Sequence, residues 1–167
     1  LSFLKRRLRD APSSVKLNAY KTLVRPVLEY ADIIWDPFQK YLTDQIDNIQ
    51  KLAARFIYSD YSLYISATSL VKRANLQLLR NCRIISKLKF IYLLYHGHYK
   101  IPCSHYLQDP FKHSNRTNHC KTIRQPFSRV NSHKHSLFPQ AILYWNKLPG
   151  SVVNCTTLDS FVKNRDK

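Results

Sequence analysis

The stretch that decides the fold is LNAYKTLVRPVLEYADIIWD, residues 17–36. Its apolar residues recur at spacings of three and four, which is the pattern of one broad helical face. That stripe consists of Leu17, Tyr20, Val24, Val27, Ala31 and Ile34. Pro26 lies inside the stretch and has no amide hydrogen, so the helix must bend or break near Arg25. We therefore predict a bent core helix against which later segments pack.

Further helices are predicted on the C-terminal side of this stretch. Residues 41–58 form one, with Thr43 as its N-cap. A short helix opens at Ser66 or Thr68 and is interrupted at Asn75, and residues 78–96 form a long helix that Gly97 ends. Residues 137–148 and a segment beginning near residue 156 add two short helices.

Residues 100–134 show no periodicity and are rich in Pro, His, Asn, Ser, Lys and Arg. They form either an extended segment lying on the helices or a mobile basic loop. Two glycines in 167 residues disfavour tight hairpins and a glycine-rich phosphate loop. The predicted fold class is mainly α: an irregular helical bundle with a long basic non-periodic segment and no substantial sheet. We expect a helical region over residues 1–99 and a C-terminal extension over 100–167, with a basic loop at 100–136 and two short helices.

The chain carries a formal net charge of +17, and its distribution is uneven. Residues 1–25 hold seven Lys or Arg and one acid, and residues 67–135 hold thirteen Lys or Arg and one acid. Residues 26–66, between these basic blocks, hold three Lys or Arg and six acids. Such a balance favours a polyanionic partner, most economically nucleic acid. A membrane surface is the weaker interpretation, and no apolar run is long enough to span a bilayer.

The candidate nucleic-acid-binding residues fall into three basic clusters. They are Lys5, Arg6, Arg7 and Arg9; then Arg80, Arg83 and Lys87; then Arg116, Lys121, Arg124 and Arg129. Interleaved aromatics such as Tyr106 and Phe127 suit stacking on exposed bases. The competing interpretation is that these side chains form an ordinary solvated surface.

Catalytic and metal sites are not indicated. Tyr30-Ala31-Asp32 resembles part of a polymerase Tyr-Ala-Asp-Asp turn, but Ile33 replaces the second carboxylate and the context is helical. The histidines and the four cysteines have no CxxC or HxxxH spacing, so no zinc site is predicted. Without a CxxC pair, free thiols in a reducing compartment are expected.

Five segments in order resemble the region after the palm in reverse transcriptases of non-LTR, jockey-like retrotransposons. They are AYKTLVRPVLEYA with WDP (residues 19–31 and 35–37), DNIQKLAARFI (47–57), LKF with LYHG (88–90 and 94–97), FP with WNKLP (138–139 and 145–149), and VV (152–153). The resemblance covers nearly the whole chain.

This resemblance implies a fragment of an RNA-directed DNA polymerase. Its region 1–99 would be a helical thumb that holds the RNA/DNA template–primer duplex, and its partners would include the palm and fingers of the same polypeptide. The family's catalytic carboxylates and their Mg²⁺ belong to the palm, so neither a catalytic residue nor a cofactor is expected in this fragment. Cytoplasm and nucleus are expected for the parent element.

The chain has no methionine and begins inside a patterned segment, so we expect a piece of a longer product. Two alternatives stay open. One is a non-catalytic helical packing or interaction module whose apolar face covers a missing domain. The other is a decayed element remnant with no role in nucleic-acid binding.

Overall fold

The stretch 17–36 is a succession of short helices. The structure, a computed structural model, describes residues 1–111 and 119–165. The stretch is covered by α2 (Ser13–Ala19), the π-helical turn η1 (Tyr20–Val24), α3 (Arg25–Glu29) and α4 (Asp32–Trp35). In the described part of the chain every element is helical, so the predicted mainly α fold class is confirmed.

The change at Arg25 follows from Pro26. A π turn replaces the α-helical bonding pattern just before it, and Pro26 then lies in the first turn of α3, where its missing donor costs nothing. The predicted discontinuity near Arg25 is therefore confirmed. A second break was not predicted: Tyr30 is extended, and Ala31 adopts the left-handed region with φ of 50°.

The predicted apolar stripe is only partly buried. Tyr20 is fully buried, and Leu17 and Val24 pack against the same cluster. Val27 and Ile34, however, are 71% and 77% exposed, so the prediction of one continuous core face is wrong for the second half. The π turn uses one residue more than an α turn, which moves Val27 off the face that Tyr20 occupies, and the left-handed Ala31 interrupts the helix before Ile34.

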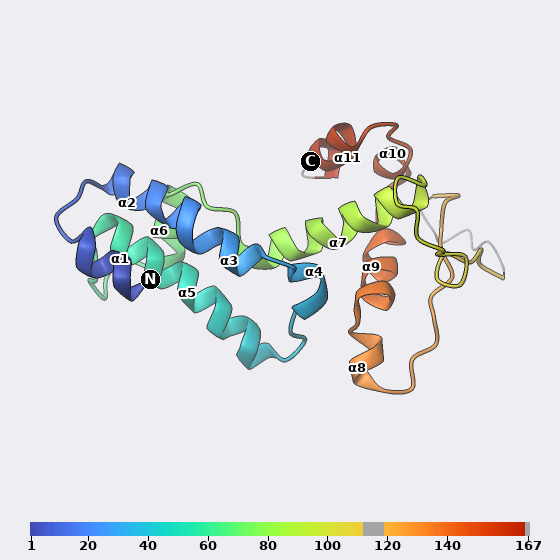
Figure 1. Ribbon diagram of the computed structural model, residues 1–167, viewed down its shortest axis with the longest axis horizontal. Helices are drawn as coiled ribbons and strands as arrows, with labels where there is room; N and C mark the ends of the chain where they lie inside the picture. The colour runs from blue at the N-terminus through green and yellow to red at the C-terminus, as the bar shows by residue number, and fades with distance from the viewer. Residues whose placement is uncertain (112–118, 166–167) are drawn as a thin grey trace. The chain divides into compact units, whose positions relative to one another are not determined.

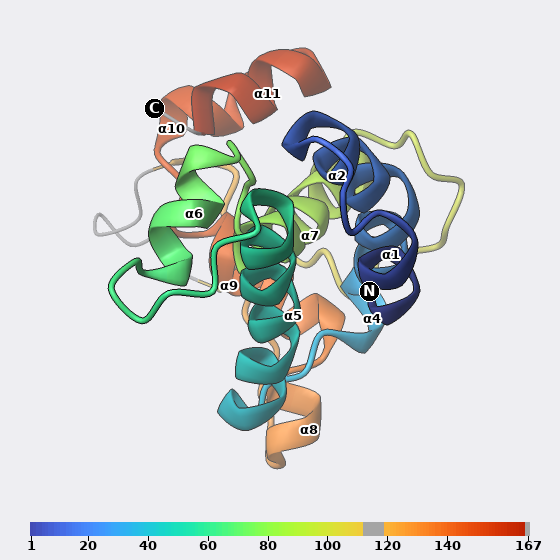
Figure 2. The same ribbon diagram turned by 90° about the vertical axis from the view of Figure 1, so that its left-hand side faces the viewer.

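The chain divides into two compact units, Leu1–Arg83 and Ile84–Lys167. In the first unit, α2 and α6 (Ala67–Arg73) lie against α5 (Lys40–Tyr58), as Figures 1 and 2 show, and α1 (Ser2–Arg7) precedes them. Ala53 and Ala54 of α5 are completely buried, and their small side chains allow the close approach of neighbouring helices. The core of this unit therefore forms where α2, α5 and α6 meet.

Helix ends test the cap predictions directly. Ser66 is the N-cap of α6, where its side chain accepts a hydrogen bond from the Thr68 amide, and Gly97 has φ of 70° after α7 (Leu79–Tyr95); both predictions are confirmed. The prediction of Thr43 as an N-cap is wrong. Helix α5 starts at Lys40, and the Thr43 hydroxyl donates back to the Gln39 carbonyl.

The border between the two units lies inside α7, whereas the sequence placed a boundary at 99/100. The C-terminal half of α7 supplies Leu88, Ile91 and Tyr92 to the core of the second unit. The border therefore falls within a continuous helix and not at its end.

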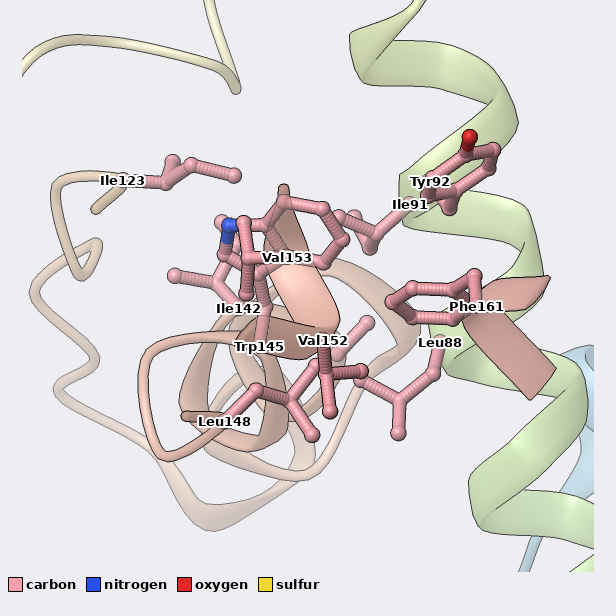
Figure 3. Close-up of a cluster of buried hydrophobic side chains, with 11 residues drawn as sticks. Leu88, Ile91, Tyr92, Ile123, Ile142, Trp145, Leu148, Val152, Val153 and Phe161 are labelled. Atoms are coloured by element: carbon pink, nitrogen blue, oxygen red, sulfur yellow. The ribbon is translucent and has the colours of Figure 1, made fainter. Parts of the chain in front are cut away.

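The second unit contains α8 (Asn131–Lys134), α9 (Leu137–Trp145), α10 (Gly150–Val153) and α11 (Leu158–Arg165). The two predicted short helices correspond to α9 and α11; α8 and α10 are additional single turns. Figure 3 shows the core, where Trp145 of α9 lies among side chains of α7, α10 and α11, Phe161 among them. Trp145 is fully buried, and its ring stacks on Phe161 at 5.9 Å between centroids.

The irregular segment before α8 is fastened to this core. The Trp145 indole donates to the Lys121 carbonyl at 2.8 Å. The Asn146 amide accepts from the Ile123 N–H at 2.9 Å and donates to the Ile123 carbonyl at 2.7 Å, which imitates a strand pairing. Ile123 itself is 3% exposed. Around these residues the extended-segment alternative is the one that the structure contains.

Candidate nucleic-acid interface

The first basic cluster covers α1 and the turn after it. Leu4 is buried and fixes the helix, which leaves Arg6, Arg7 and Arg9 exposed and Lys5 half-buried. The Lys5 ammonium lies 5.9 Å from the centre of the Tyr61 ring. Among the described residues no carboxylate lies within 4 Å of these four cations. Their charge is therefore available to an external anion.

The second cluster is divided by burial. Arg80 is exposed, whereas Arg83 and Lys87 are 2% and 1% exposed. Arg83 pairs through Nε with Asp36 at 2.9 Å, and its Nη2 lies 3.9 Å from Asp47. Lys87 donates to the side-chain oxygen of Gln140. Their burial is the reason to leave Arg83 and Lys87 out of an interface, because neither presents its charge to solvent.

The third cluster lies on the irregular segment of the second unit. Arg124 and Arg129 are exposed, and Lys121 is half-buried with its ammonium donating to the Val153 carbonyl at 3.4 Å. Arg116 lies outside the described residues. The fastening of this segment to α9 holds Lys121 and Arg124 in fixed positions, although no regular element carries them.

Arg124 lies close to several aromatic rings. Its guanidinium lies 3.6 Å from the centre of the Phe111 ring, and its Nη1 donates to Gln108 at 3.1 Å. A cavity of about 360 Å³ beside it is lined by ten residues, among them both aromatics predicted to stack on bases, Tyr106 and Phe127. Phe127 is 84% exposed, so its ring is accessible to a base. Tyr106 already stacks on Phe138, with 4.0 Å between the ring centroids.

Lys16 is a charged residue of α2 that the sequence did not single out. It is only 3% exposed, and its ammonium donates to the Ser59 hydroxyl at 2.7 Å. Its sequence neighbourhood, with Ser14 and Val15 before it, does not distinguish it from a solvated lysine. Only the packing of α2 on the end of α5 buries it.

The residues that were weighed for catalysis or metal binding are an aspartate, the histidines and the cysteines. Asp32 is buried at the start of α4. Burial, followed by the charges of Lys121 and His98, lowers the pKa of His96, which favours its neutral form. Burial likewise raises the pKa of the Cys82 thiol, whose sulfur accepts from Arg25 at 3.1 Å. All four cysteines are free, and in the described part no three potential metal ligands gather.

Comparisons of the chain with family models, curated protein sequences and solved structures found no match. The resemblance to a reverse transcriptase therefore stays a prediction. Within residues 1–111 and 119–165, no helix is long and apolar enough to cross a membrane.

Proposed function

We propose that this chain grips a nucleic-acid duplex through its phosphates, as the helical part that follows the palm in a non-LTR retrotransposon reverse transcriptase. One observation carries the proposal. Eight of the predicted cations are exposed or half-buried, and none lies within 4 Å of a carboxylate of the described residues. These are Lys5, Arg6, Arg7, Arg9, Arg80, Lys121, Arg124 and Arg129.

The proposed mechanism is electrostatic. Phosphate contacts fix the position of a protein on a duplex without reading its sequence, and they release condensed counterions. Binding should therefore tolerate any sequence and weaken steeply with salt. The catalytic carboxylates and their Mg²⁺ would come from the palm of the parent polymerase, so the fragment alone is expected to grip and not to polymerise.

The test is a titration of the whole 167-residue chain against a labelled RNA–DNA hybrid by fluorescence anisotropy, between about 50 and 200 mM salt. With six or more phosphate contacts, affinity falls by roughly a thousandfold over that range. Two hybrids of unrelated sequence should give the same affinity at each salt concentration. Salt-independent binding, or no binding at low salt, contradicts the proposal.

A second candidate function is that of a packing module, and a different observation favours it. Val27 of α3, Tyr30 between the two helices and Ile34 of α4 are each more than 70% exposed. An apolar row of this kind suits burial against another domain, here the palm and fingers of the parent polypeptide. In this case V27S/I34S should reduce self-association in sedimentation, whereas L63S, at a 96% exposed loop position, should not. Equal behaviour of the two variants counts against this candidate.

A further inference from the structure

A cavity of about 420 Å³ opens in the first unit between the turn after α1, the side of α2 and the end of α5. Its lining includes three cations, Lys5, Arg9 and Lys16, and one acid, Asp10. No pair of these lining groups lies within 4 Å as a salt bridge. The cavity therefore has an excess of positive charge that its own acid does not neutralise.

Lys16 is the unusual member of this group. Lysine is almost never fully buried without a charged partner, yet Lys16 is 3% exposed and has no carboxylate of the described residues within 4 Å. Its ammonium donates to the Ser59 hydroxyl at 2.7 Å and lies 5.3 Å from the centre of the Phe56 ring. An ammonium has three donors, so hydrogen-bonding capacity remains at the edge of the cavity.

Ser59, the partner of Lys16, has an unusual backbone conformation. It follows the last turn of α5 with φ of 52°, a left-handed conformation that glycine adopts most easily. A serine here carries backbone strain that glycine would avoid, and its hydroxyl is the group that holds the Lys16 ammonium. The residue at this helix end therefore combines a left-handed backbone with the side-chain contact to Lys16.

Lys5 and Arg9 lie at the more open side of the same cavity. Lys5 is half-buried near Tyr61, and Arg9 is exposed. A buried ammonium at a cavity that two further cations also line is an arrangement that suits a tetrahedral oxyanion, because such a group accepts several charge-assisted hydrogen bonds at once. A single carboxylate has fewer acceptor directions and would leave donors unused.

We propose that this cavity binds a phosphate group, with Lys16 donating from its inner wall and Lys5 and Arg9 from its entrance. The phosphate comes from a nucleic-acid strand if the function proposed above holds, and from a free phosphate or nucleotide if it does not. Lys16 then serves as a buried phosphate contact, whereas the arginines of the surface clusters are exposed ones.

The test uses amide NMR spectra of the full chain titrated with inorganic phosphate, with the dinucleotide dTpdT and with an RNA–DNA hybrid. The amides of Ser59, Tyr61 and Arg9 should shift. K16Q should weaken phosphate binding about tenfold, the loss expected for one charged donor. Because K16Q changes a buried group, R9Q at an exposed position is the second variant and should weaken binding severalfold. K72Q, an exposed lysine of α6 outside the cavity, is the matched control and should change nothing.

The outcomes separate the two proposals. Phosphate shifts spread over the surface, or equal weakening by R9Q and K72Q, overturn the cavity site even if the hybrid binds. Shifts at the cavity with no hybrid binding at low salt support the site, assign it to free phosphate or nucleotide, and overturn the proposed function instead.

Discussion

Arg83 illustrates how a charged side chain can belong to the interior. Its guanidinium is 2% exposed and pairs with Asp36 at 2.9 Å, and both of its Nη atoms lack a hydrogen-bond partner in the described part of the chain. Removing one partner of a buried pair costs about 3–5 kcal/mol, because the other charge loses its compensation. We expect R83A to lower the free energy of unfolding by about 3 kcal/mol, measured by urea denaturation.

Two controls accompany this variant. R80A removes an exposed arginine of the same helix and should change stability by less than about 0.5 kcal/mol. R83M keeps the volume of the side chain and should recover part of the loss. If R83A and R80A were equally stable, the ion pair would have no structural role.

Tyr20 gives a pH-dependent prediction. Burial raises its pKa to about 12 from an ordinary value of 10.0, with nearby Arg25 opposing the rise, and its hydroxyl has no hydrogen-bond partner among the described residues. The folded protein therefore keeps this proton at pH values where the unfolded chain loses it. The contribution of Tyr20 to stability is complete below pH 10 and is lost as the pH rises toward 12.

Y20F removes this titration. The difference in unfolding free energy between Y20F and the wild type should move in favour of Y20F by roughly 2 kcal/mol between pH 9 and 12. Below pH 9 the variant should be at least as stable as the wild type, since a buried hydroxyl without a partner contributes only its desolvation cost. A constant difference across this pH range would contradict the account.

For individual residues, the sequence identified the charged side chains but not which of them are buried. The exposed arginines of the first and third clusters were identified, but Arg83 and Lys87 were placed in one cluster with Arg80, which lies on the same helix. Their burial depends on Asp36, Asp47 and Gln140, which are distant in the sequence. Lys16 was missed for the same reason, because Ser59 holds it from another helix.

Among the elements, the irregular segment before α8 is held in part by one side-chain amide. Asn146 makes two hydrogen bonds to the backbone of Ile123, and these hold the segment that carries Lys121 and Arg124. N146A leaves both backbone groups without that partner, which costs about 1–3 kcal/mol. Hydrogen exchange of the Ile123 amide should accelerate by at least tenfold, whereas N154A, at an exposed asparagine, should leave it unchanged. Unaltered protection in N146A would show that the Asn146 amide is not what holds the segment.

Element positions were predictable where local chemistry decides them. The helix ends at Ser66 and Gly97 follow from a capping hydroxyl and from a residue that tolerates positive φ. The break at Ala31 had no such signal, because alanine normally avoids the left-handed region. The exposed Ile34 comes after this break, whereas the exposed Val27 comes before it and after the π turn.

For the whole molecule, charge was predictable and its arrangement was not. A net charge of +17 follows from composition, whereas the availability of eight cations follows from the absence of nearby carboxylates in the described residues. The division inside α7 could not be predicted either, since helix periodicity does not show where one compact unit ends and the next begins. The proposed function depends on the net charge and on the availability of the eight cations, and not on the division inside α7.

The measurement that tests the proposed phosphate grip most directly compares salt slopes. The logarithm of the binding constant for an RNA–DNA hybrid is plotted against the logarithm of salt concentration for the wild type and for R6Q/R7Q/R124Q/R129Q. Each lost phosphate contact should make the slope less steep by about 0.9, so the variant should differ by up to roughly 3.6. K40Q/K51Q, which removes two exposed lysines outside the clusters, should keep the wild-type slope. Equal slopes for the wild type and the quadruple variant would contradict the proposed function.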